Sequence, residues 1–148
     1  MLEASIEHTA QTLFQALKTY ETYLVTAESC TGGLLASYLT SMAGSSSLFE
    51  RGFITYSNNA KQDLLGVQAQ TLNDHGAVSP ATAREMAKGA LVNSRSDIAI
   101  SITGIAGPDG GSDSKPVGLV YFGLCSQNMS TVSQEQHFEG TRETVRLQ

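Results

Sequence analysis

The chain has 148 residues, of which 41% are apolar, and a formal net charge of −5. This length suits one globular domain with its own core and excludes two independent cores. The nine basic residues are spread thinly along an acidic chain, which excludes a cationic surface for a polynucleotide. We therefore expect no nucleic-acid partner.

Neither a membrane segment nor a metal site is indicated by the sequence. It contains no apolar run of about eighteen residues and no basic, apolar leader. We expect no membrane association and a cytoplasmic location. The two cysteines, Cys30 and Cys125, do not make a disulfide framework, and no Cys or His spacing resembles a zinc site.

The first third of the chain alternates helix and strand. Apolar residues at helical spacing predict a helix that ends near Tyr20, and residues 23–27 have the character of a buried strand. A second helix is indicated by four apolar residues at three-to-four residue spacing, Leu34, Leu35, Tyr38 and Leu39. Residues 43–47 then form a hydroxyl-rich loop, which is either a plain connection or a polar wall of a site.

The middle of the chain continues this alternation. Residues 52–56 are predicted as a strand, and Ser57 as the cap of a short helix through Leu64 that Gly66 ends. A cap followed by proline at Ser79-Pro80 begins the next helix. Its small-residue stripe predicts close packing on a sheet or on a subunit partner, and consists of Ala83, Met86, Ala87, Ala90 and Leu91.

The last third is dominated by strands. We predict strands over 97–102, 117–125 and 131–138, the last being a polar edge strand that returns antiparallel. A final helix begins at Arg142, and its scarcely two turns lead us to expect that part of a terminal helix is missing. The whole pattern predicts a single α/β domain over 1–148, a three-layer α/β/α sandwich with a mixed, mostly parallel sheet and an antiparallel edge.

A strand runs directly into a helix over residues 26–33, and this junction is our candidate active site. Ser29 and Thr31 are both good caps, and Gly32 and Gly33 allow a ligand or backbone to come close. A helix start offers unpaired N–H donors that suit a phosphate, a carboxylate or a developing oxyanion. The alternative interpretation is that Ser29 merely caps the helix.

A hydroxyl nucleophile needs a base, and the three histidines, His8, His75 and His137, are poorly placed to provide one. Lys61 is a better candidate if burial lowers its pKa, because an ordinary lysine is neutral in only about one molecule in 2,500 at pH 7. Tyr56 lies five residues earlier and could relay the proton or orient the lysine.

Cys30 is an alternative nucleophile, because a thiol at a helix start can have a lowered pKa. Its side chain points about 100° away from that of Ser29, so only one of the two can face a pocket. The sequence leaves both open.

A glycine-rich loop follows the strand at 97–102, beginning at Thr103 and Gly104. It matches neither the dinucleotide-binding fingerprint nor a P-loop. Open α/β sheets nevertheless place ligands at such strand ends.

Several longer motifs follow one another along nearly the whole chain: Thr26–Gly33, Gly44–Ser46, Arg51–Asn58, Lys61, Leu65–Val67, Gly76–Ser79, Thr103–Pro108 and Lys115–Gly118. Together they resemble the C-terminal domain family of the competence-damage-inducible protein CinA. The resemblance implies a bacterial amidase that hydrolyses nicotinamide mononucleotide to nicotinate mononucleotide and ammonia in pyridine-nucleotide recycling. It also implies the stand-alone form of the domain, an activity without metal or organic cofactor, and a homodimer.

Carried over by position, the resemblance makes Ser29 the nucleophile, with Lys61 and Tyr56 as its proton-transfer partners. It implies oxyanion binding at the helix start, joined by Gly104, and phosphate binding by Ser46 and Arg142. The full set of residues expected to bind substrate is Thr31, Gly32, Gly33, Ser46, Thr103, Gly104 and Arg142.

Two other functions fit the same motifs. One is a catalytically silent nucleotide-binding paralogue that acts as a partner in competence or DNA repair. The other is an amidase or esterase that acts on a different nucleotide or small amide, since no residue identifies the nicotinamide ring.

Overall fold

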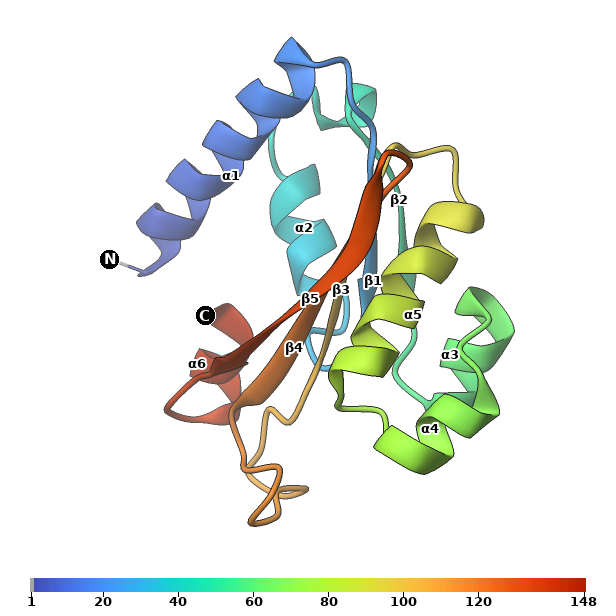
Figure 1. Ribbon diagram of the computed structural model, residues 1–148. Helices are drawn as coiled ribbons and strands as arrows, with labels where there is room; N and C mark the ends of the chain where they lie inside the picture. Colours follow the sequence, from blue (N-terminus) through green and yellow to red (C-terminus); the bar gives the residue numbers. More distant parts are fainter. Residues whose placement is uncertain (1) are drawn as a thin grey trace.

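Five strands form one mixed sheet at the centre of the molecule, in the computed structural model that describes residues 2–148 (Figure 1). The order across the sheet is β2-β1-β3-β4-β5. The strands are β1 (Leu24–Glu28), β2 (Phe49–Ile54), β3 (Ile98–Gly104), β4 (Leu119–Ser126) and β5 (Met129–His137). All five predicted strands are therefore present, with bounds that differ by a few residues.

Helices cover both faces of this sheet (Figure 1). One layer contains α1 (Leu2–Thr19), α2 (Leu34–Thr40) and α6 (Arg142–Leu147), and a short 3₁₀ turn, η1 (Ser45–Ser47), precedes β2. The other layer contains α3 (Asn58–Leu65), α4 (Ala69–His75) and α5 (Pro80–Val92). The predicted three-layer α/β/α sandwich is confirmed.

The direction of each strand follows from what connects it to the next. Helices lie between β1 and β2 and between β2 and β3, and β1 pairs parallel with both β2 and β3. A loop without a helix leads from β3 to β4, and these strands are antiparallel, as are β4 and β5. A parallel return needs a crossover segment, usually a helix, whereas an antiparallel one does not. The antiparallel part of the sheet thus comprises two of its four pairings.

Side chains alternate between the two layers along β1. Val25 and Ala27 pack with the stripe of α5, while Leu24 packs with Phe14 of α1 and Leu39 of α2. The α5 stripe is buried inside the chain, so it packs on the sheet and offers no surface to a subunit partner. This explains the small side chains of that helix.

The parallel strands β1, β2 and β3 end at the same edge of the sheet, where Ser29, Thr55 and the glycine-rich loop follow them. Helix α3 packs closely against α5 through its last residue, because a Cβ at Gly89 would overlap the carbonyl oxygen of Leu65. Lys61 lies in α3 and is thereby fixed next to the strand ends.

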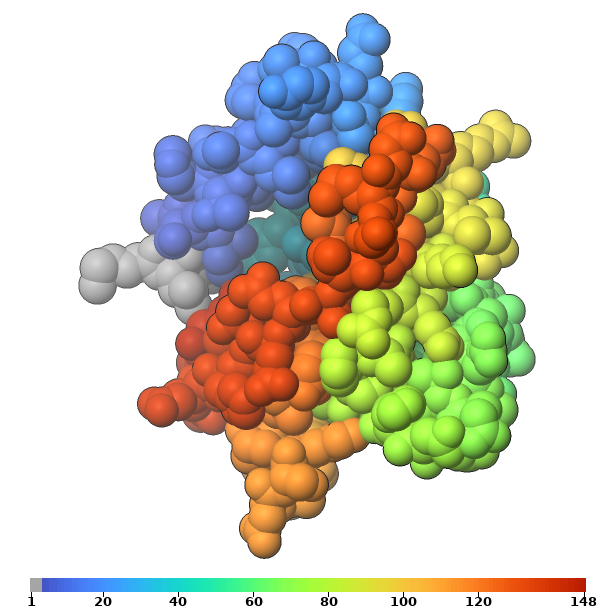
Figure 2. Space-filling model, viewed as in Figure 1, coloured from blue at the N-terminus to red at the C-terminus, as the bar shows by residue number. Residues whose placement is uncertain are grey.

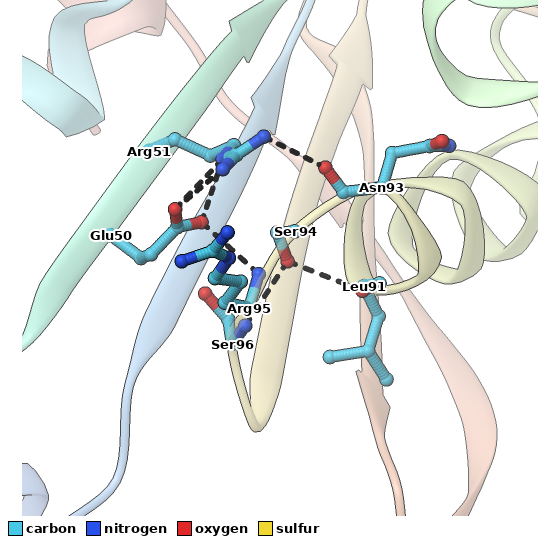
Figure 3. A network of polar contacts seen from close by, with 7 residues as sticks. All are labelled: Glu50, Arg51, Leu91, Asn93, Ser94, Arg95 and Ser96. Carbon is cyan, nitrogen blue, oxygen red and sulfur yellow. Dashed lines mark hydrogen bonds and ion pairs between the residues drawn. The ribbon is translucent and has the colours of Figure 1, made fainter.

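The opposite end of the sheet carries an exposed polar network (Figure 3). Arg51 of β2 forms an ion pair with Glu50 at 2.7 Å and donates to the carbonyl of Asn93, just after α5. The backbone N–H of Arg95 donates to the same glutamate. These contacts connect the start of β2 to the turn that leads into β3.

A separate cleft opens between α1, α2, α6 and the sheet, with a volume of about 470 Å³ and mostly apolar walls. Figure 2 shows it as a hollow between α1 in blue and β5 in orange-red, with α2 at its floor. Across residues 2–148, none of the helices combines the length and the apolar character that a membrane crossing requires.

Candidate active site

The junction between β1 and α2 is a sharp turn that places Ser29 at the sheet edge. The N–H of Ser29 donates to the carbonyl of Ile102 in β3 at 2.9 Å, which docks the turn beside the neighbouring strand. Gly32 and Gly33 adopt φ values of 60° and 98°, in the left-handed region that favours glycine. They allow the chain to reverse into α2 within a few residues.

Glu28, the last residue of β1, caps α2. Its carboxylate accepts hydrogen bonds from the N–H groups of Gly33, Leu35 and Ala36 at 2.8–3.1 Å. The prediction that Ser29 or Thr31 caps this helix is wrong, because the N-cap position is Gly33, two residues after Thr31. The buried carboxylate of Glu28 accepts the hydrogen bonds from the first N–H groups of the helix instead. The sequence could have indicated this cap, because Glu28 is an acidic residue directly before the turn, where its charge complements the helix dipole.

This cap changes which donors remain for a ligand. Gly32 and Leu34 donate their N–H groups to the carbonyls of Ser29 and Thr31, so with the Glu28 contacts the start of α2 is saturated. The N–H groups of Cys30 and Thr31 have no carbonyl or carboxylate acceptor within residues 2–148. Apart from the contact of the Cys30 N–H with its own thiol, the two donors that directly follow Ser29 have no acceptor among the described residues and could bind an oxyanion.

Lys61 extends from α3 to Ser29. Its Nζ lies 3.1 Å from Ser29 Oγ, 2.9 Å from the carbonyl oxygen of Thr55 and 3.4 Å from that of Tyr56. The lysine is only 1% exposed, and no carboxylate within residues 2–148 forms an ion pair with it. Burial lowers its pKa from the ordinary value of 10.5, and the nearby Cys30 opposes this effect.

The three contacts of Lys61 fit either protonation state of its amine. As an ammonium, Nζ donates to Ser29 Oγ and to the carbonyls of Thr55 and Tyr56. As a neutral amine, it donates to the two carbonyls and offers its lone pair to the hydroxyl proton of Ser29. The lowered pKa increases the share of the neutral form at a given pH, and in that form the lysine can accept the Ser29 proton without help from a histidine.

The histidines lie elsewhere. His8 is in α1, His75 ends α4 and His137 ends β5, and the side-chain partner of Ser29 is Lys61. Over residues 2–148, the His, Cys, Asp and Glu side chains form no group of three that could hold a metal ion. The candidate chemistry is therefore that of the serine and the lysine.

Cys30 faces away from Lys61. It is buried in an apolar cluster that includes Ile102, Val120 and Val145, and it lines the 470 Å³ cleft on the α6 side of the sheet. Burial raises the pKa of its thiol to about 11, so it is not a thiolate at neutral pH. Of the two side chains that the sequence left open, Ser29 is the one that contacts Lys61 Nζ.

Tyr56 and Arg142 meet at the mouth of the site. The Tyr56 side chain is 59% exposed, and its hydroxyl accepts a hydrogen bond from Arg142 Nη2 at 2.8 Å. Nη1 of the same arginine donates to the carbonyl of Gly107 in the glycine-rich loop. The predicted contact between the Tyr56 hydroxyl and Lys61 is absent, since Tyr56 contacts the lysine through its carbonyl.

Thr103 and Gly104 lie at the end of β3, at the same edge as Ser29. The Thr103 hydroxyl is buried and donates to the carbonyl of Ala77 at 2.8 Å. A Cβ at Gly104 would lie 2.7 Å from a methyl group of Val120. Both residues thus serve the packing of this edge.

Ser46 is not brought to the site within this chain. Strands β1 and β2 are parallel, with Leu24 opposite Phe49 and Glu28 opposite Ile54. Ser46 precedes β2 and so lies at the start of these strands, whereas Ser29 follows their end. Four to five strand residues, about 15 Å, separate the two edges.

Arg146 was given no role from the sequence, yet it contacts the turn that carries Ser29. Its Nη2 donates to the carbonyl of Thr31 at 2.9 Å and would lie 3.7 Å from a Cβ at Gly32. The available signal was its position one turn after Arg142.

Comparison with known proteins places this geometry in a family. The model of the CinA C-terminal domain matches residues 6–148. The chain is 48% identical to "Nicotinamide-nucleotide amidohydrolase PncC" of Escherichia coli (strain K12). This match covers all 148 residues of the chain and 90% of the relative. It is 60% identical over 116 residues to a "Putative competence-damage inducible protein" of Caldicellulosiruptor bescii, 78% of this chain but only 28% of that protein.

Solved structures agree with the sequence matches. The crystal structure of the competence/damage inducible protein CihA from Agrobacterium tumefaciens superposes with a TM-score of 0.93 at 47% identity, covering 96% of this chain and 87% of that one. The CinA superfamily protein from Escherichia coli gives 0.91 at 39% identity, with 96% and 82% covered. On these matches, the chain belongs to the CinA C-terminal domain family.

Proposed function

We propose that this chain is a nicotinamide-nucleotide amidohydrolase, which converts nicotinamide mononucleotide to nicotinate mononucleotide and ammonia with Ser29 as nucleophile. The full-length relatives named for this activity support the reaction. The observation that carries the mechanism is the 3.1 Å contact between Ser29 Oγ and the buried, unpaired Lys61 Nζ.

The first half of the reaction forms an acyl-enzyme. Ser29 Oγ attacks the carboxamide carbon while neutral Lys61 takes the hydroxyl proton. The carbonyl oxygen becomes an oxyanion, which the free N–H groups of Cys30 and Thr31 bind; such a donor is commonly worth about 3 to 4 kcal/mol. Lys61 then delivers the proton to the departing nitrogen, the C–N bond breaks and ammonia leaves.

The second half hydrolyses the nicotinoyl ester on Ser29. A water molecule enters the place of ammonia and gives a proton to Lys61 as its oxygen attacks the ester carbon. Collapse of the intermediate breaks the bond to Ser29 Oγ, and Lys61 returns the proton to that oxygen. The product forms as the carboxylic acid, loses its proton to water and leaves as the carboxylate, with Ser29 and neutral Lys61 restored.

The mouth of the site supplies the groups for the nucleotide. The exposed ring of Tyr56 is positioned for the pyridinium ring, which is cationic and attracted by an aromatic face. Arg142 lies against it and can bind the phosphate through a charge-assisted contact. Because Ser46 lies at the other sheet edge, phosphate binding within one chain rests on Arg142 and the glycine-rich loop.

The test is ammonia release from nicotinamide mononucleotide, without added metal, by the wild type, Ser29→Ala and Cys30→Ala. We expect Ser29→Ala to lose about 10³-fold or more of kcat. Cys30→Ala is the matched control at the adjacent position, and we expect it to stay within about threefold because its thiol faces the apolar cluster.

Other outcomes identify the alternatives. Activity that survives in Ser29→Ala but is lost in folded Cys30→Ala would establish a thiol mechanism. A wild type that binds nucleotides in a thermal-shift assay but releases no ammonia would favour the silent paralogue in competence or DNA repair. Turnover of other amides alone would favour a different substrate.

A homodimer and a cytoplasmic location remain proposals. The alanine stripe no longer supports the dimer, because it packs on the sheet. Light scattering at several protein concentrations measures the mass directly, and a monomer mass throughout would contradict the dimer.

A further inference from the structure

We propose that Arg146 is a positioning residue for this reaction: from α6, it holds the turn that carries Ser29 and its two oxyanion donors. Its Nη2 donates to the carbonyl of Thr31 at 2.9 Å, across 115 residues of sequence. The inference rests on the proposed function for its catalytic consequence, but the contact itself does not.

The contact acts on the part of the turn that the reaction uses. The carbonyl of Thr31 also accepts from the N–H of Leu34, so it is the point where the turn joins α2. Thr31 is nine-tenths buried, and the guanidinium lies over Gly32, next in the chain. The carbonyl of Thr31 belongs to the peptide unit that directly follows Thr31 N–H and contains Gly32 N–H, which donates to the carbonyl of Ser29, so holding it limits the movement of the turn that carries the N–H groups of Cys30 and Thr31.

Helix α6 is itself fixed by packing and hydrogen bonds, so it can position the turn through Arg146. Val145, adjacent to Arg146, is 4% exposed and packs with Cys30, Ile102 and Val120. Arg142, one turn earlier on the same helix, donates to the carbonyl of Gly107 and to the Tyr56 hydroxyl. The same short helix therefore contacts the mouth of the site and the nucleophile turn.

A charged donor is suited to this role. Hydrogen bonds from a guanidinium are roughly twice as strong as those between neutral groups. The glycines of the turn give its backbone more freedom than other residues would, so an external contact has a larger ordering effect there. A turn displaced by about 1 Å would cost about 100-fold in rate while leaving the nucleotide contacts at Arg142 intact.

The experiment compares Arg146→Met, Arg146→Lys and Arg84→Met. Methionine keeps an unbranched apolar side chain and removes the donors, whereas lysine keeps the charge and one contact. Arg84→Met is the matched control, because Arg84 is also half-buried and also donates one hydrogen bond, to Ser133 on β5. Amide hydrogen exchange over residues 29–33 and the separate values of kcat and KM are measured for each.

For Arg146→Met we expect exchange over 29–33 to become about tenfold faster and kcat to fall about 10- to 100-fold, with KM within about threefold. Arg146→Lys should recover most of both losses, and Arg84→Met should change neither. The separation of kcat from KM distinguishes positioning from loss of a substrate contact.

Unchanged exchange over 29–33, or unchanged kcat in an active background, would overturn the inference. So would an Arg146→Lys variant as impaired as Arg146→Met, and this comparison serves alone if the methionine variant does not fold. A wild type that fails to release ammonia would overturn the proposed function instead, while the exchange measurement, which needs no substrate, still decides whether Arg146 holds the turn.

Discussion

The two ends of β2 hold a cation in opposite ways. At the start of the strand, Arg51 is exposed and bound by Glu50, which raises the pKa of the guanidinium and lowers that of the carboxyl (Figure 3). Just beyond the other end, Lys61 is buried and contacts two carbonyls and a hydroxyl, with a lowered pKa. One arrangement stabilises the charged form of its side chain and the other destabilises it.

The difference lies in the partner that each cation has. A carboxylate stabilises the charged form, whereas a carbonyl oxygen can accept a hydrogen bond from either the ammonium or the amine. Burial then shifts Lys61 toward the neutral amine. The side chains differ as well, because a guanidinium stays charged in proteins whereas a buried lysine can lose its proton and serve as a base.

Removing the base should give the largest effect. We expect Lys61→Met to fold and to lose about 10³-fold or more of kcat, because a general base contributes about 10² to 10⁴ and the amine also returns the proton to the leaving group. Steady-state ammonia release measures the loss. Activity near that of the wild type would exclude Lys61 as the base.

The same variant should also change how stability depends on pH. In the wild type the folded pKa of Lys61 lies below the unfolded value of 10.5, so between the two values the unfolded state binds more protons and stability rises with pH. The cost of burying the charged ammonium is complete below the folded pKa and absent above 10.5. In urea unfolding, the free energy of unfolding of the wild type should therefore rise relative to that of Lys61→Met as the pH approaches 10.5.

The pH dependence of kcat/KM tests the neutral amine directly. Only deprotonated Lys61 can accept the Ser29 proton, so the rate should rise about tenfold per pH unit and level off below pH 10.5. Measurements above pH 7 keep the substrate phosphate ionised, since its second pKa is near 6. A rate that is flat from pH 7 upward in an active enzyme would require a folded pKa already below 7, and a rate that falls with pH would contradict the assignment.

Much of the fold follows from local sequence patterns. Strand character, helical spacing and the caps at Ser57 and Ser79 predict the elements because each depends on residues near in sequence. The extent of the antiparallel part of the sheet is harder to predict from the sequence. It depends on the loop between β3 and β4 having no helix, and the sequence indicates this only because apolar residues at helical spacing are missing there.

The site was less completely predictable from the sequence. Ser29 and Lys61 stand out through motifs that resemble a family, but the roles of Glu28 and Arg146 depend on tertiary contacts. A glutamate at a strand end is usually exposed, and its three N–H partners become visible only once the turn is in place. The phosphate contact of Ser46 stays a prediction, since its loop lies at the other sheet edge within this chain.

An intermediate effect is expected for Glu28→Gln, which tests a buried carboxylate that caps a helix without pairing a cation. An amide offers one acceptor oxygen for the three N–H groups of Gly33, Leu35 and Ala36, so we expect a stability loss of about 1 to 3 kcal/mol. The distorted turn should also lower kcat about tenfold. Urea unfolding and kinetics measure the two effects, and unchanged values for both would show that the cap is dispensable.

The smallest effect is expected at the other end of β2, where Glu50→Gln serves as the matched control for Glu28→Gln. Glu50 is near the surface and its ion pair with Arg51 is open to solvent, so water and salt already screen most of the attraction. We expect kcat/KM and its pH profile to be unchanged, and any small loss of Tm to disappear in high salt. A marked loss of activity would mean that this network acts on the distant sheet edge, and that Arg51 and Lys61, at the two ends of β2, are coupled.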